Sequence, residues 1–370
     1  MSSPLPDSAR RPSFYLLVIV LIALLAGMPG FRAQAQEKPV ILRNFLEKHV
    51  HLTQDELAAL DRGKVVTKTL PTQDKREIAV FGIVFVHVSA EKYARKFEDI
   101  ENFKKSKMVL QIHKFQTPPQ LSDLASLQLP KVDLDSLRDC RVGHCGVKLP
   151  ADMIARFHAE INWRAPGSKE KATALYRQAL FGYVQAYVEG GNAALGEYND
   201  KKHPVRLADE FAGLLRYSPY LNEYAPEFHS FLENYPKEKL EDTKEFLYWS
   251  METFGLKPTI SVTHVTIYRQ EGAKGETIFI ATKQIAASHY FDASLGLTVL
   301  VEAEDARGKP GVYVVYVNRS RADALKGRFG GMRRGVVEGK TLNAMKKNLA
   351  ELRDRLEAEP SDLANVQHQE

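Results

Sequence analysis

The sequence has little cysteine, little excess charge and almost no long apolar runs, and each shortage excludes a class of protein. With only two cysteines in 370 residues, the chain is not a small disulfide-stapled scaffold, and it is long enough to bury a sizeable core. A formal net charge of +5 is too small for a dedicated nucleic-acid-binding domain, so we expect no nucleic acid partner. Hydrophobic residues at 44% and charged residues at 26% exclude a disordered chain and a polytopic membrane protein.

The one long apolar run lies at the N-terminus. Arg10 and Arg11 precede an apolar stretch from Phe14 to Ala26, and Ala33 and Ala35 then supply small residues in an A-x-A pattern. This pattern predicts a signal peptide over residues 1–35, cleaved near Ala35, and therefore a periplasmic or secreted protein. The alternative is an uncleaved anchor, although the stretch is shorter than the roughly 20 apolar residues that cross a bilayer.

Both cysteines, Cys140 and Cys145, fall in one short segment. In an oxidising compartment a pair so close in sequence is most simply a disulfide. The alternative is a redox or metal site that adds His144 as a third ligand, but the spacing is not that of a C-x-x-C motif. We therefore expect no metal ion and no cofactor.

The mature chain changes its pattern twice. The first part predicts strands over residues 64–70, 77–88 and 108–115 and a helix over 90–103. Apolar residues at three-to-four spacing then predict a helical segment over residues 150–256, whose last helix runs from Glu241 to Phe254. Between these helices lies a row of aromatic residues that either pack between helices or close over a ligand: Tyr217, Tyr220, Tyr224, Phe228, Phe231 and Tyr235.

From Thr259 onward the sequence pattern again repeats every two residues, as in a strand. Residues 259–269, 276–287, 295–303 and 311–317 predict four strands with short turns between them, and hence antiparallel hairpins. A long amphipathic helix follows, with an apolar stripe that includes Met345 and Leu349 and is suited to packing against a sheet. Residues 358–370 predict a disordered tail.

This order of elements resembles the helix-grip fold of the START-like (SRPBCC) superfamily. The resemblance rests on Ile78 to Phe103 and on Thr259 to Leu356. It implies an α+β fold in which a curved antiparallel sheet wraps around the long C-terminal helix, here built from residues 36–149 and 257–357 with residues 150–256 as a large helical insertion. It also implies a cavity for a small apolar, lipid-like ligand, and thus an exported, non-catalytic binding or carrier protein.

Polar residues on two of the predicted strands are candidates for contact with that ligand. At every second position of one strand lie His264, Thr266 and Tyr268. On the next strand lie Thr282 and Gln284. A ligand pocket tolerates a few convergent polar groups better than a dry core does. The alternative is that these side chains face solvent.

A second candidate site lies in a turn after a strand. His289 could act as an acid or base with Asp292 orienting it, next to Tyr290. The alternative is a turn in which the Asp caps the backbone while the aromatic residues pack. The acid–base reading corresponds to a hydrolase or another enzyme acting on a hydrophobic substrate in the same cavity. A third reading is an envelope interaction protein that binds no ligand and docks a partner through its helical insertion.

Basic residues are concentrated before and within the last helix. Between Arg319 and Lys347 nine basic residues accompany two acidic ones. This excess predicts contact with an anionic membrane surface through Arg328, Arg333 and Arg334, because each basic residue near such a surface contributes ~1 kcal/mol. The alternative is a solvated face of the helix.

Overall fold

The structure is a computed structural model that describes residues 38–253, 257–271, 276–322, 325, 330–360 and 363. The chain divides into two units, Met1–Ala35 and Gln36–Glu370, and every described residue belongs to the second. The predicted signal peptide and much of the predicted tail therefore lie outside the described residues. None of the helices in the described ranges is both long enough and apolar enough to cross a bilayer.

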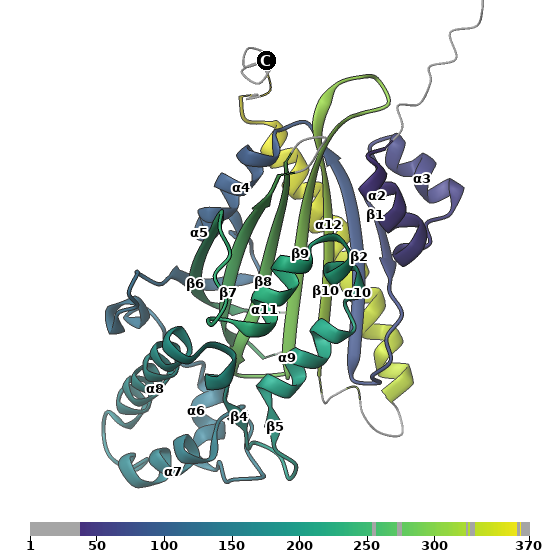
Figure 1. Ribbon diagram of the computed structural model, residues 1–370. Coiled ribbons are helices and arrows are strands. Elements are labelled where there is room, and N and C mark those ends of the chain that lie inside the picture. The colour runs from purple at the N-terminus through teal and green to yellow at the C-terminus, as the bar shows by residue number, and fades with distance from the viewer. Residues whose placement is uncertain are drawn as a thin grey trace, which may run out of the picture. The chain divides into compact units, whose positions relative to one another are not determined.

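The fold is α+β and is built on one large antiparallel sheet. Eight strands pair in the order β1-β2-β10-β9-β8-β7-β6-β3 (Figure 1). Their bounds are β1 Val66–Thr69, β2 Glu77–Val86, β3 Val109–Lys114, β6 Thr243–Glu252, β7 Thr259–Gln270, β8 Thr277–Ala287, β9 Ala293–Glu304 and β10 Pro310–Arg321. The four consecutive strands predicted from residue 259 onward are confirmed as β7 to β10, each antiparallel to the next.

Helices cover both faces of this sheet (Figure 1). One face carries α4 Ala90–Glu98, α5 Ile100–Phe103 and α12 Gly330–Glu357. The other carries α2 Val40–Phe45, the π-helical turn η1 Leu46–Val50, α3 Gln54–Asp61, α9 Leu207–Arg216, α10 Pro219–Tyr224 and α11 Pro226–Asn234. Further elements pack at one end of β6 and β7: η2 Leu121–Leu124, α6 Lys131–Arg138, α7 Ala151–Glu160, α8 Ser168–Gly190, η3 Gly191–Ala194, and the short strands β4 Glu197–Tyr198 and β5 Val205–Arg206.

One predicted helix, over residues 241–254, is wrong. The segment is strand β6, with Phe246 and Tyr248 on one face of the sheet and Leu247 and Trp249 on the other. Because both faces are covered, the strand is apolar on both sides, and such a run cannot be distinguished from a buried helix by periodicity. The helical segment between β3 and β6 therefore ends at Asn234, earlier than the predicted boundary at residue 256.

The C-terminal helix α12 lies against β2 and β1. All ten residues of β2 are buried, as its two apolar faces predict. At the centre of this contact Gly82 allows the helix to come close, because a Cβ atom there would stand 2.7 Å from Leu349 Cδ1 and 2.8 Å from Met345 Sδ. The predicted apolar stripe of α12 thus packs on the sheet.

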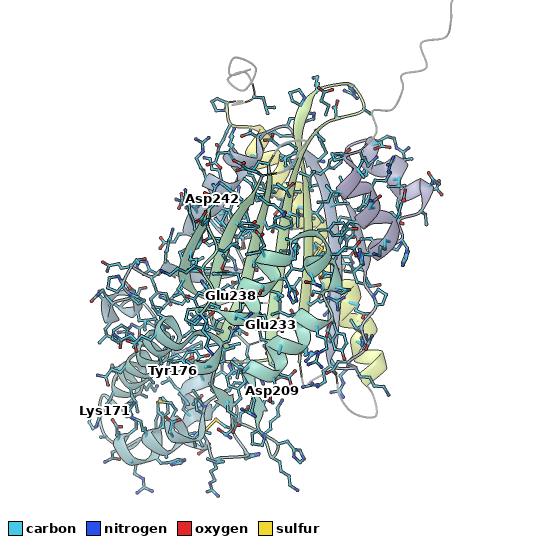
Figure 2. The ribbon with its side chains drawn as sticks, viewed as in Figure 1. Lys171, Tyr176, Asp209, Glu233, Glu238 and Asp242 are labelled. Carbon is cyan, nitrogen blue, oxygen red and sulfur yellow. A yellow bond between two sulfur atoms is a disulfide. The ribbon has the colours of Figure 1, made fainter. Side chains whose placement is uncertain are left out.

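Two prolines determine where helices begin on the face of the sheet opposite α12. Pro219 and Pro226 each occupy the first turn of a helix, so the aromatic row is divided between α10 and α11 rather than forming one rod. Figure 2 draws the side chains and shows Asp209 and Glu233 on α9 and α11, two of the helices that cover this face. Phe228 of α11 is fully buried, so the row packs between helices and sheet along part of its length.

Candidate functional site

An apolar crevice lies between α2, α10 and the sheet. The lining residues come from all three: Ile41, Leu42, Phe45, Tyr220, Leu221, Tyr224, Phe279, Leu297, Val299, Val301, Val315 and Val317. The crevice has an open volume of about 40 Å³, which is room for about one water molecule. Any larger ligand must therefore move α2 or α10 away from the sheet.

The cover of this crevice is short and irregular. Phe45 of α2 meets the rings of Tyr220 and Tyr224 edge-on, with centroids 5.6 and 6.2 Å apart. After α2 the chain forms the π-helical turn η1, which ends at His51 with a left-handed φ of 55°. Such π turns are rare and occur frequently at functional sites. On the side of α2, the cover of this part of the sheet thus consists of six residues of α-helix and one π turn.

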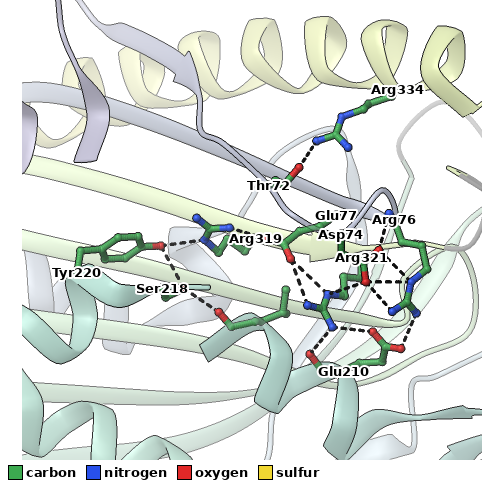
Figure 3. Close-up of polar contacts among 11 residues, drawn as sticks. Thr72, Asp74, Arg76, Glu77, Glu210, Ser218, Tyr220, Arg319, Arg321 and Arg334 are labelled. Carbon is green, nitrogen blue, oxygen red and sulfur yellow. Dashed lines mark hydrogen bonds and ion pairs between the residues drawn. The ribbon is translucent and has the colours of Figure 1, made fainter. Parts of the chain in front are cut away.

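A cluster of buried charges, which we call the arginine cluster, lies where β10 ends (Figure 3). Glu77 is fully buried and accepts from Arg319 Nη1, while its Oε2 lies 3.3 Å from both Nε and Nη2 of Arg321. Arg321 also donates to Glu210 Oε2 at 3.0 Å. Gly213 makes room for this guanidinium, because a Cβ there would stand 2.3 Å from Arg321 Nη1. The cluster therefore joins β2 and β10 to α9.

The outer part of the cluster is built around Arg76. Its guanidinium contacts Asp74 Oδ2 at 2.7 Å and Glu210 Oε1 at 2.5 Å. Burial alone would raise the pKa of Asp74, but the hydrogen bonds and charge of Arg76 hold that pKa below its ordinary value. The cluster contains as many carboxylates as guanidinium groups: Asp74, Glu77 and Glu210 against Arg76, Arg319 and Arg321.

Tyr220 connects the apolar crevice with the arginine cluster. Its ring lines the crevice. Its hydroxyl accepts from Arg319 Nε at 3.3 Å and donates to Ser218 Oγ at 3.3 Å. The crevice therefore has one polar end.

Lys283 and His264 form a separate buried cluster on the same face of the sheet. They are cross-strand partners on β8 and β7, and both are buried. Lys283 Nζ donates to Asn192 Oδ1 and lies 4.0 Å from the centroid of the Phe211 ring, while His264 Nδ1 lies 2.9 Å from the Tyr187 hydroxyl. Burial lowers the pKa of Lys283 to about 7 and also lowers that of His264.

The predicted ligand residues do not converge on one pocket. The register pairs Thr266 with Ala281 and Tyr268 with Phe279, which puts His264, Thr266 and Tyr268 on the face that α9 to α11 cover. Thr282 pairs with Val265 and Gln284 with Thr263, so these two point to the opposite face, the one that carries α12. Paired residues share a face of a sheet, and neighbours along a strand alternate.

The predicted acid–base residues are held in buried polar contacts. The ring of His289 has Asp133 of α6 as its partner, with 2.7 Å between Nε2 and Oδ1. Asp292 forms an ion pair of 2.6 Å with Lys148, and its backbone N–H donates to Arg321 O, so two distant segments fix the turn in place. Tyr290 accepts from the backbone N–H of Lys257 and has a left-handed φ of 62°.

The three predicted membrane-contact residues differ from one another. Arg333 is exposed on α12. Arg334 is partly buried. It donates to Glu338 Oε1 at 2.8 Å and also to the hydroxyl of Thr72. Arg328 lies outside the described residues. Of the two described residues, only Arg333 is exposed to solvent. The contact with a membrane stays a prediction.

Cys140 and Cys145 form the predicted disulfide. The small loop between them is fixed to the following segment, since Gly143 N–H donates to Asn199 O and Cys145 N–H to Asp200 O. Elsewhere in the described ranges, no three His, Cys, Asp or Glu side chains gather as a metal-binding group. Comparison of the sequence with protein-family models and with curated proteins found no match.

Sequence reasoning missed the residues that give the crevice its polar end. Glu77 stood at the start of a predicted strand and Arg319 in a basic stretch, but nothing in the sequence pairs them across 242 positions. A weak signal was present, because Glu77 is the one charged residue in an otherwise apolar ten-residue strand. A charge in a strand buried on both faces requires a partner.

Proposed function

We propose that the protein is an exported, non-catalytic binding or carrier protein for an apolar, lipid-like molecule, held in a START-like, helix-grip type of fold. The observation that carries the proposal is the crevice under α2 and α10, whose lining is apolar apart from two tyrosine hydroxyls. Apolar concave sites with few polar groups are the usual form of small-molecule sites. Because His289 and Asp292 are buried in contacts with Asp133 and Lys148, we base the function on the crevice.

The ligand enters by displacing the cover. An open volume of about 40 Å³ holds no lipid chain, so α2 and η1 must separate from α10 when the ligand binds. The cover is suited to this motion, because α2 has six residues and begins directly after Pro39, without a side-chain cap. A hinged cover of this kind would expose Phe45 and the sheet together.

The test is binding of a neutral apolar fluorophore, N-phenyl-1-naphthylamine, to the wild type and to a variant in which the crevice is filled. Val299 lines the crevice and is partly exposed, so Val299→Trp can occupy the space with limited overpacking. We expect the Kd to rise at least about tenfold, which corresponds to about 1.4 kcal/mol.

The matched control is Leu110→Trp, since Leu110 is 49% exposed on the edge strand β3. This variant should bind the fluorophore as the wild type does. Absence of binding by the wild type, or equal binding by both Trp variants, would overturn the proposal. Native mass spectrometry of the protein purified from its own envelope should in addition show a co-purifying lipid mass.

A further inference from the structure

Resting on the proposed function, we propose that the ligand is an amphiphile with a carboxylate headgroup, of the long-chain fatty acid type, and that Arg319 binds the headgroup together with Tyr220. The crevice would hold the apolar chain and the arginine cluster would receive the carboxylate.

The register of β9 and β10 places Arg319 at the end of the apolar surface. Val299 pairs with Val315, Leu297 with Val317, and Leu295 with Arg319. Every second residue of a strand points to the same face, roughly 7 Å further along. Arg319 is therefore the next side chain on the crevice side after Val317.

The narrow end of the crevice leads to the same place. A second gap shares Tyr220, Leu221, Leu297 and Val317 with the crevice and continues to Leu295, the cross-strand partner of Arg319. It has no open volume for a water-sized molecule. A headgroup therefore reaches Arg319 only when α10 moves away from the sheet, and a carboxylate requires a smaller displacement than a phosphate ester.

Arg319 has hydrogen-bonding capacity left for such a group. Nη1 donates to Glu77 and Nε donates to Tyr220 over a long 3.3 Å, whereas Nη2 has no hydrogen-bond partner among the described residues. A guanidinium can bind a carboxylate with two parallel N–H donors. If Arg319 turned toward the ligand, Glu77 would keep both of its contacts with Arg321.

The charge of the surroundings favours a monoanion. The guanidinium groups and carboxylates of the arginine cluster balance, three against three. Lys283 lies on the same row of the sheet, because it pairs with Leu295, which in turn pairs with Arg319, and a nearby anion would favour its protonated form. No carboxylate of the described chain forms an ion pair with Lys283, whose polar partner is the amide oxygen of Asn192. One carboxylate would offset the charge of the protonated lysine.

The experiment compares palmitic acid with its methyl ester as competitors for the neutral fluorophore. We expect the wild type to bind the acid at least about tenfold more tightly than the ester, since a charge-assisted pair is among the stronger hydrogen bonds. Tyr220→Phe keeps the ring that lines the crevice and should reduce this preference about threefold.

The stronger variant is the double substitution Arg319→Met with Glu77→Gln, which removes one charge of each sign so that no buried carboxylate loses its partner. It should abolish the preference for the acid, so that the acid and the ester bind with equal Kd. Arg307→Met, at the exposed turn between β9 and β10, is the control and should keep the preference.

The outcomes separate the two proposals. Equal binding of acid and ester by the wild type, or an unchanged preference in the double variant, would overturn the headgroup assignment while the apolar binding function stands. Binding of neither palmitate nor its ester nor the fluorophore would overturn both.

Discussion

Lys283 shows how a single residue can make the stability of this fold depend on pH. Its side chain is 3% exposed, and its burial lowers its pKa to about 7, whereas an unfolded chain has a lysine pKa of about 10.4. Between these two values the unfolded state binds more protons than the folded state. The free energy of unfolding therefore rises with pH in this window, and the cost of burying Lys283 is fully present below it.

We expect a slope of up to about 1.4 kcal/mol per pH unit between pH 7 and pH 10 from this one group. Urea unfolding of the wild type and of Lys283→Met, measured at pH 7, 8 and 9, should show the slope in the first protein and its loss in the second. Lys131→Met is the control, because the side chain of Lys131 is 83% exposed. The same slope in Lys283→Met as in the wild type would contradict the prediction.

Single residues were also where sequence reasoning was least complete. The sequence offered Asp292 as the residue that orients His289, whereas the carboxylate that contacts the His289 ring is that of Asp133, 156 positions away. Cys140 and Cys145 were predictable as a pair because proximity along the chain is enough to bring them together. A partner supplied by another element leaves no such local trace.

At the scale of elements, the contact between α12 and β2 depends on one glycine. Gly82→Ala would place a Cβ atom 2.7 Å from Leu349 Cδ1, so the helix or its side chains must shift. Because Leu349 Cδ1 lies at the end of a flexible side chain, we expect Gly82→Ala to lower the free energy of unfolding by about 1 kcal/mol, at the lower end of the overpacking range. In chemical denaturation the double variant Gly82→Ala, Leu349→Ala should lose less than the sum of the two single variants, because the smaller side chain relieves the clash.

Gly335 provides the matched comparison on the same helix. A Cβ atom there would meet nothing within 4 Å, so Gly335→Ala should raise the free energy of unfolding by about 0.5–1 kcal/mol through helix propensity alone. Additive effects of Gly82→Ala and Leu349→Ala, or a stabilising Gly82→Ala, would contradict the close contact at Gly82.

Several elements were predictable because their signals are local. Thr53 caps α3 by accepting from the Glu56 N–H, and the Glu56 side chain accepts from the Thr53 N–H in return. Ser89 caps α4 with one such bond, because its side chain accepts from the Lys92 N–H. Strand β6 was mispredicted as a helix, because periodicity does not distinguish an apolar run covered on both faces from a buried helix, and β6 has few of the β-branched residues that mark β2 as a strand. Its neighbours in the sheet, and not its own sequence, make it a strand.

At the scale of the whole molecule, the N-terminal pattern predicts that residues 1–35 are removed from the protein. Expression of the full sequence in a bacterial host should yield a mature protein whose first residue is Gln36, because the small residues Ala33 and Ala35 suit a signal peptidase. Intact mass spectrometry and N-terminal sequencing of the periplasmic fraction measure this directly. Ala35→Leu should retain the precursor, and a wild-type protein that keeps residues 1–35 in the membrane fraction would support the uncleaved anchor instead.

The sequence by itself determined the α+β class, the antiparallel hairpins from β7 to β10, the amphipathic character of α12 and the disulfide. All of these depend on residues within a few positions of one another, through period, turn chemistry or proximity. Only the tertiary structure decided that Tyr220 and Arg319 meet at the end of an apolar crevice, and that Thr282 and His264 point to opposite faces. The physical reason is the register of the sheet, which couples residues far apart in sequence and which one residue of slip would reverse.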